Sequence, residues 1–202
     1  MHWTTYKKMR WFKEIYLDEN LSLKILDVGS LDTSGEDYNY KSIFKDNPNW
    51  LYVGLDFQEG DNVDILVNDI YNWIEIEDSS YDVIISGQLF EHLEYFWLTM
   101  NEINRVLKPG GFCCIIAPQG GPKHGATETD CYRFTEDGLR AMAKYVNFEV
   151  LHTSMNKDSK PWLDTCLVAK KEGILNSNIQ DLQLKIYKLE NKLDQILDTI
   201  TK

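Results

Sequence analysis

The chain has 202 residues and a mass of 23.6 kDa, enough for one domain with a buried core and too little for two ordinary ones. Hydrophobic residues make up 43% and charged residues 26%, close to globular averages, which excludes a mainly disordered chain. The formal charge of -11 argues against a nucleic-acid-binding protein, because phosphate binding requires a basic surface. No apolar run is long enough to cross a bilayer, so no membrane span is expected.

The four cysteines indicate a reducing compartment. They form neither CxxC pairs nor a dense disulfide pattern, and residues 1–4 do not begin a secretory signal. We therefore expect a cytoplasmic protein. Cys113 and Cys114 are neighbours in a strand-like run and should point to opposite faces of that strand.

Through residues 1–172, short strand-like runs alternate with longer helical ones. Residues 1–20 contain an amphipathic helix (2–19) with a broad aromatic side, and further helices are expected at 40–46, 89–107 and 135–145. The helix at 89–107 ends at a strong stop signal, Lys108-Pro109-Gly110-Gly111, and Thr135 caps the last helix. The strand-like runs cover residues 24–28, 52–56, 64–67, 81–86, 112–118, 148–153 and 164–170.

This alternation predicts an α/β fold. Strands separated by helices need crossover connections and form a mostly parallel sheet that is covered on both faces. Only residues 154–163 separate the last two strands, which can therefore pair antiparallel. The expected architecture is a doubly wound, Rossmann-like, seven-stranded sheet with an antiparallel last strand. Such a sheet binds its ligand beyond the carboxyl ends of the strands.

The loop after the first strand-like run carries a glycine and two acids. Gly29 directly follows the buried strand, where it allows a sharp turn and a close approach of a ligand to the backbone. Asp27 and Asp32 suit a ligand with an ammonium group and repel phosphate. The G-x-G-x-x-G pattern of a dinucleotide fold is missing, which argues against a nucleotide-linked dehydrogenase. By itself the segment also fits an ordinary strand-to-helix turn.

Acids also end the next two strand-like runs. Asp56 lies at the tip of the second run, where a carboxylate can bind both hydroxyls of a ribose and Phe57 can flank a base. Asp69 follows the third run and is placed to accept from an exocyclic amine. Either acid alone is more often a solvated loop residue, but acids after three successive strands favour a binding site.

Four segments, in this order and spacing, are similar to one enzyme family. They read Leu26-Asp27-Val28-Gly29-Ser30, Val53-Gly54-Leu55-Asp56, Tyr81-Asp82-Val83-Ile84-Ile85-Ser86 leading into Leu89-Phe90-Glu91-His92-Leu93, and Arg105-Val106-Leu107-Lys108-Pro109-Gly110-Gly111. Through them, residues 25–118 resemble the class I S-adenosylmethionine-dependent methyltransferases, in particular the type-11 group. The family often has a second glycine where Ser30-Leu31 stand here.

The resemblance implies S-adenosyl-L-methionine as the cofactor, held by residues in the loops after the strands. Those implied at the methionine end and the sulfonium are Asp27, Gly29, Ser30 and Gln88. The resemblance implies that Asp56 binds the ribose hydroxyls and that Phe57 and Ile70 flank adenine. It implies that Asp69 binds the amino group of adenine.

The dipeptide Glu91-His92 looks like an acid–base pair, since histidine titrates near neutral pH. In the family it stands at the start of the helix after the fourth strand. Support of that helix and of the cofactor loop is therefore the simpler interpretation, with direct catalysis as the alternative. No metal-binding set is predicted.

The long loop at residues 119–134 is rich in side chains that donate or accept protons, and such loops are usually functional. Its His…Asp-Cys-Tyr-Arg-Phe pattern is similar to a subgroup of type-11 methyltransferases found with glycan-building enzymes, and residues 162–169 resemble that subgroup's last strand. We expect His124 to act as general base, with Asp130 orienting it or the substrate. The alternative is that Asp130 pairs with Arg133 and holds the loop in place.

The expected reaction is O-methylation of a sugar or another small polar acceptor by in-line displacement. The protein aligns the reacting atoms and excludes water, and His124 accepts the hydroxyl proton; a carboxylate acceptor would need no base. The alternative function is a catalytically inactive cofactor-binding head of a coiled-coil assembly.

Residues 173–202 form a separate segment with a regular heptad pattern. The a positions are Ile179, Ile186, Leu193 and Ile200, and the d positions are Leu175, Leu182, Leu189 and Ile196. Isoleucine at a with leucine at d favours a parallel two-stranded coiled coil, so we expect a homo-oligomer, preferably a dimer, through residues 175–200. A trimer and a helix folded back on its own domain are the alternatives.

Overall fold

The structure, a computed structural model, describes residues 3–32, 39–124 and 129–173, together with residues 182, 186, 187 and 189 of the tail. Contacts divide the chain into Met1–Lys171 and Glu172–Lys202. Most of the predicted coiled coil lies outside the described residues. Within the described part, none of the helices combines the length and the apolar character that crossing a bilayer requires.

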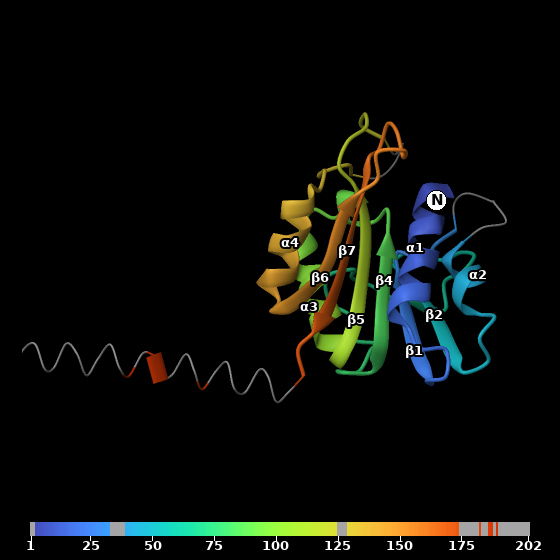
Figure 1. The fold of residues 1–202 in the computed structure, drawn as a ribbon. Helices are drawn as coiled ribbons and strands as arrows, with labels where there is room; N and C mark the ends of the chain where they lie inside the picture. Colours follow the sequence, from blue (N-terminus) through green and yellow to red (C-terminus); the bar gives the residue numbers. More distant parts are fainter. Residues whose placement is uncertain are drawn as a thin grey trace, which may run out of the picture. The chain divides into compact units, whose positions relative to one another are not determined.

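The larger unit is built around a seven-stranded sheet with the order β3-β2-β1-β4-β5-β7-β6. Every neighbouring pair from β3 to β5 is parallel, whereas β7 runs antiparallel to both β5 and β6. This confirms the predicted mostly parallel sheet with an antiparallel last strand (Figure 1). The strands are β1 (Leu23–Val28), β2 (Trp50–Asp56), β3 (Ile65–Leu66), β4 (Tyr81–Gly87), β5 (Leu107–Pro118), β6 (Phe148–Met155) and β7 (Asp164–Lys171).

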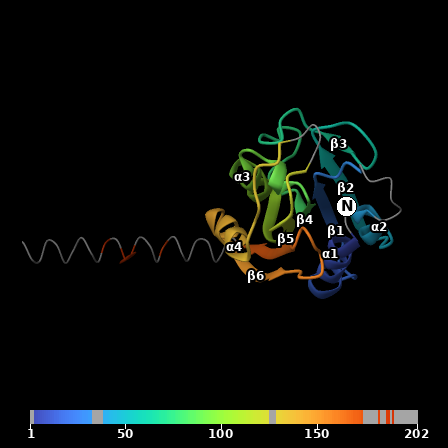
Figure 2. The same cartoon turned by 90° about the horizontal axis from the view of Figure 1, so that it is seen from above.

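Helices cover both faces of the sheet, as predicted (Figures 1 and 2). One face carries α1 (Trp3–Tyr16) and α2 (Tyr40–Phe44), and the other carries the 3-10 helix η1 (Phe90–His92), α3 (Phe96–Val106) and α4 (Glu136–Tyr145). Cys113 packs in the α3–α4 layer and Cys114 in the α1–α2 layer, so the two side chains lie on opposite faces of β5 as expected.

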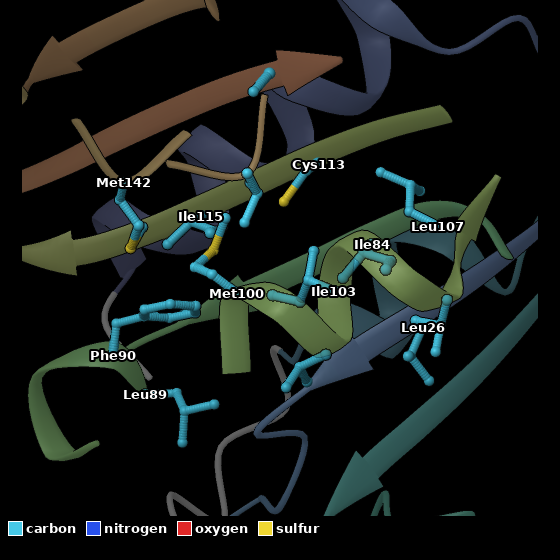
Figure 3. Close-up of a cluster of buried hydrophobic side chains, with 14 of the residues drawn as sticks. Leu26, Ile84, Leu89, Phe90, Met100, Ile103, Leu107, Cys113, Ile115 and Met142 are labelled. Atoms are coloured by element: carbon cyan, nitrogen blue, oxygen red, sulfur yellow. The ribbon is translucent and has the colours of Figure 1, made fainter. Parts of the chain in front are cut away.

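The α3–α4 layer is the larger of the two hydrophobic clusters (Figure 3). Ile84 of β4 and Ile115 of β5 pack there with Ile103 of α3 and Met142 of α4. Burial of such a side chain contributes about 1.5–3 kcal/mol. The cluster thereby fixes the central strands whose carboxyl ends carry the predicted site.

The predicted helix over 89–107 is wrong in one respect, because the chain forms η1 and α3 separately. Leu93 between them is extended, with φ -82° and ψ 115°. The carbonyl of Glu91, which a continuous helix would pair with Tyr95, instead accepts from the backbone N–H groups of Cys131 and Tyr132 at 2.7 and 3.1 Å. The loop after β5 thus interrupts the helix.

The predicted stop signal at residues 108–111 ends α3 but does not form a loop. β5 begins at Leu107, directly after the helix, so these residues lie within the strand. The ladder with β4 shifts register between Tyr81 and Val83, and Gly110 has a φ of +83°. A strand irregularity therefore accommodates the proline and glycines.

Candidate active site

Two adjoining cavities lie where β1, β2, β3 and β4 end. The larger has a volume of about 450 Å³ and the smaller about 100 Å³, and they share Gly29, Leu31 and Gln88. This is the position that a doubly wound sheet offers to a ligand. The larger cavity is lined by Gly29, Leu31, Asp56, Phe57, Gln58, Ile70, Tyr71, Gln88, Leu89, His92, Leu93, Glu94 and Thr129.

Gly29 lets the backbone approach both cavities. Its φ is +82°, and a Cβ added there would lie 3.0 Å from the side chain of Leu89. Its N–H and that of Ser30 donate to the carbonyl of Leu55 at 2.9 and 3.1 Å, which holds the turn against β2. A side chain at position 29 would strain this turn and collide with Leu89 at the cavity wall.

Asp27 is buried at the wall of the smaller cavity, where only 2% of the residue is exposed. Its Oδ2 accepts from the Tyr52 hydroxyl at 2.5 Å, whereas its Oδ1 has no hydrogen-bond partner among the described residues. Burial raises the pKa of this carboxyl to about 7. A buried acceptor without a donor is costly, so an ammonium group of a ligand would stabilise the ionised form.

Ser30 secures the loop from the other side. Its hydroxyl donates to the carbonyl of Asn62 at 2.9 Å, and the Asn62 amide donates to the carbonyl of Ser30 at 2.9 Å. The same amide donates to the Tyr52 hydroxyl at 2.9 Å, which connects the loop to the Asp27 carboxylate. Ser30 thus lines the smaller cavity and its hydrogen bonds hold the cavity wall together, while its contact with the methionine end of the cofactor stays a prediction.

Asp56 lies at the wall of the larger cavity with a fixed orientation. Its carboxylate accepts from the backbone N–H groups of Leu31, Phe57 and Gln58 at 3.0, 2.8 and 3.1 Å. Loops from two strand ends therefore position this single side chain, as the predicted ribose site requires.

Apolar side chains face the same cavity. Phe57, which is 44% exposed, and Ile70, which is 9% exposed, both line it, and their contact with adenine stays a prediction. Leu31 and Tyr71 line it as well and were not predicted. Asp69 lines neither cavity; it is exposed and accepts from the N–H of Tyr71 at 2.8 Å.

Gln88 lies between the two cavities and has a φ of +60°, a strained value for a residue with a side chain. Its backbone N–H donates to the carbonyl of Ile116 at 2.9 Å, and its side-chain amide donates to Asp164 at 3.1 Å. These bonds to β5 and β7 keep the strained residue in place beside the predicted sulfonium position.

The loop after β5 brings His124 and Asp130 together. The Asp130 carboxylate accepts from the His124 backbone N–H at 2.9 Å, and it lies 3.5 Å from the Nδ1 atom of the imidazole. Arg133 donates to both carboxylate oxygens and so holds the pKa of Asp130 well below its usual range. Both interpretations of Asp130 therefore have a geometric basis, since it faces His124 and also ties the loop to Arg133.

The Glu91-His92 dipeptide lies next to His124, which the sequence did not indicate. The His92 and His124 rings have centroids 4.9 Å apart, and Glu91 Oε1 is 3.8 Å from His92 Nε2 and 4.0 Å from His124 Nε2. Burial raises the pKa of Glu91 to about 8. Of the two histidines, His92 and not His124 lines the larger cavity.

A family model described as a methyltransferase domain matches residues 38–115. Residues 38–115 are thus similar to a methyltransferase domain. The family resemblance predicted from the sequence motifs is thereby confirmed. No protein with a curated description matches the chain.

Solved methyltransferase structures share the fold. A chain in the complex between the Haloferax volcanii Trm112 methyltransferase activator and a methyltransferase is 17% identical, with a TM-score of 0.65 over 85% of this chain and 90% of that one. The 1,6-didemethyltoxoflavin-N1-methyltransferase of Burkholderia thailandensis is 15% identical, with a TM-score of 0.64 over 83% and 78%. That structure contains 1,6-didemethyltoxoflavin and S-adenosylhomocysteine.

The (4+2)-cyclase SpnF shares the fold equally well, at 15% identity and a TM-score of 0.64 over 83% of this chain and 81% of that one. At these identities the comparisons with solved structures establish the fold alone. The reaction must be argued from the site itself.

Proposed function

We propose that this protein is an S-adenosylmethionine-dependent methyltransferase that methylates a hydroxyl group of a sugar or another small polar acceptor. The observation that carries the proposal is the Asp27 carboxylate, which is buried at a cavity wall with one oxygen that lacks a hydrogen-bond partner in the described part. An amino acid ammonium group is a chemically suitable partner for it.

The residues around the two cavities fit the rest of S-adenosyl-L-methionine. The Asp56 carboxylate suits the ribose hydroxyls, and Phe57 and Ile70 offer apolar surface to the adenine ring. Gln88 lines both cavities, which suits a sulfonium between the methionine and the nucleoside. The larger cavity has a typical size for a small-molecule site, at about 450 Å³. Asp69 stays a prediction for the adenine amino group.

When bound, the cofactor supplies a methyl group already activated by its sulfonium. The residues of the chain then have to orient both reactants, exclude water and take up a proton from the acceptor. We propose that His124 accepts this proton. Asp130, whose carboxylate lies 3.5 Å from the imidazole Nδ1, orients the ring. Burial lowers the pKa of His124, which favours the neutral form that a base needs.

Methyl transfer from tritium-labelled S-adenosylmethionine into pools of sugars and glycans tests the proposal. We expect label in an acceptor with the wild-type chain and little with His124→Ala, while both bind S-adenosylhomocysteine equally in calorimetry. Turnover by His124→Ala within about twofold of wild type would remove the base role, because a positioned base contributes about 10²–10⁴-fold. Cofactor binding without transfer to any acceptor would favour the inactive cofactor-binding head.

We further propose that residues 175–200 form a parallel coiled coil that makes the protein a homo-oligomer, preferably a dimer. The heptad pattern supports this proposal. Leu182, Ile186 and Leu189, three positions of the seam, are helical, with 57%, 54% and 65% of each residue exposed. A cytoplasmic location likewise remains our prediction.

A further inference from the structure

Three side chains that can bind a cation meet beside the larger cavity, and one of them, His92, lines it. Glu91 and His92 come from η1, and His124 comes from the loop after β5. One ligand atom of each lies within 4.8 Å of the others. The proposed function uses His124 as a base and gives Glu91 no chemical role.

Glu91 is the unusual member of this cluster. The residue has no exposed surface, and neither of its carboxylate oxygens has a hydrogen-bond partner among the described residues. The distances of 3.8 and 4.0 Å to the two imidazole nitrogens are too long for hydrogen bonds. Burial disfavours the ionised form of this carboxyl, and a cation bound beside the two imidazoles would stabilise that form.

Both imidazoles are oriented with Nε2 toward Glu91. His92 Nδ1 lies 2.7 Å from the carbonyl of Thr129, which can only accept, so in the neutral imidazole Nδ1 carries the proton and Nε2 a lone pair. His124 Nδ1 lies 3.5 Å from the Asp130 carboxylate without a hydrogen bond between them, and its Nε2 is directed at Glu91. In histidines that bind metals, the ring nitrogen that does not bind the metal typically donates to a carbonyl or carboxylate oxygen.

We propose that Glu91, His92 and His124 bind one divalent first-row transition-metal ion such as Zn²⁺. Two imidazole nitrogens and one carboxylate oxygen suit such an ion, whereas Mg²⁺ and Ca²⁺ prefer oxygen ligands alone. The three ligand atoms lie within 4.8 Å of one another, so an ion held at about 2.0–2.2 Å from each requires only small side-chain movements.

The ion would act on the acceptor, a consequence that rests on the proposed function. Three protein ligands leave at least one coordination position open, and His92 and Thr129 both line the larger cavity. An acceptor hydroxyl bound there is more acidic. Its O–H bond breaks with the proton passing to solvent water, the new O–CH₃ bond forms, and the C–S electron pair stays on sulfur. With the ion bound, this route replaces the proton transfer to His124 proposed above, because His124 then serves as a metal ligand.

Titration of Zn²⁺ into the 202-residue chain, stripped of metal beforehand with a chelator, tests this proposal without an acceptor. Calorimetry and elemental analysis should give one Zn²⁺ per chain. Glu91→Gln and His92→Asn should each weaken binding at least about tenfold, because loss of even an outer partner of a metal ligand costs about 10–100-fold.

Two control variants separate this site from other zinc-binding side chains. His152→Asn removes an imidazole on β6 outside the cluster, and Cys131→Ser removes an exposed thiol of the loop. Both should bind Zn²⁺ as the wild type does, with thermal unfolding to check that every variant folds. Absence of saturable binding, equal affinity in Glu91→Gln and wild type, or loss of binding in Cys131→Ser overturns the proposal.

Titration of S-adenosylhomocysteine into the same samples keeps the two proposals apart. If it binds and Zn²⁺ does not, the metal site is wrong and the proposed function stands. If Zn²⁺ binds with the expected variant pattern and the nucleoside does not, the proposed function fails and the metal site stands.

Discussion

Asp27 is buried, accepts one hydrogen bond from Tyr52 and lines the smaller cavity. Burial raises its pKa to about 7, the Tyr52 hydroxyl opposes that shift, and the nearby Asp56 charge adds to it. The carboxyl is therefore partly protonated at neutral pH in the empty site. Binding of an ammonium group requires the ionised form, which couples ligand affinity to pH.

We predict that the affinity for S-adenosylhomocysteine rises with pH between about 5.5 and 7.5, a range in which the ligand's amino group stays charged. The sign follows from the raised pKa, because the carboxyl must lose a proton to bind and does so as the pH passes through about 7. Asp27→Asn should bind more weakly and with no such slope. Calorimetry at several pH values measures both; an equal slope in the variant would contradict the role of Asp27.

Asp56 allows a test of the proposed ribose site. Asp56→Ala should weaken cofactor binding by about tenfold or more, since it removes charge-assisted hydrogen bonds to the ribose, each worth about 1.5–3 kcal/mol. Asp64→Ala is the matched control, because Asp64 also accepts a backbone N–H, that of Gly54 at 2.8 Å, but lines neither cavity. Similar affinities in the two variants would argue against the ribose assignment.

Elements that carry a local signal could be predicted from the sequence. β1 is followed directly by Gly29, and α4 begins where the Thr135 hydroxyl accepts from the Gly138 N–H at 3.1 Å. Both signals depend on neighbouring residues only. The helix over 89–107 could not be predicted correctly, because its interruption depends on hydrogen bonds from residues 131 and 132.

The same distinction applies to the site. Asp27, Gly29 and Asp56 directly end or follow strands, so their meeting at one edge of the sheet follows from the strand pattern. The contact of Glu91 and His92 with His124 depends on how the loop after β5 folds back, which no local pattern records. The only signal was a Glu-His pair after one strand and a histidine after its neighbour.

At the scale of elements, α3 is held by its buried face. Ile103→Ala should lower the free energy of unfolding by about 2–5 kcal/mol, because it leaves a cavity in the cluster of Figure 3. Ile74→Ala is the control: this residue is 77% exposed, and its replacement should change stability by no more than about 0.5 kcal/mol. Urea unfolding measures both, and equal effects would contradict the assigned core.

At the scale of the whole molecule, the chain divides into Met1–Lys171 and Glu172–Lys202, close to the change in composition at residue 173. Deletion of residues 174–202 should convert an oligomer into a monomer, because the heptad seam would be lost. Light scattering coupled to size exclusion measures the mass of both forms. A truncated chain that forms the same oligomer as the full chain would contradict the coiled coil. Cofactor affinity that is unchanged by the deletion would support separate functions for the two parts.

In the function we propose, the carboxylates after β1 and β2 form a binding site for S-adenosylmethionine. Calorimetric titration of S-adenosylhomocysteine into the wild-type chain at pH 7.5 or above, where Asp27 with its pKa of about 7 is mostly ionised, tests it most directly. We expect saturable binding of one nucleoside per chain. No saturable heat of binding under these conditions would contradict it.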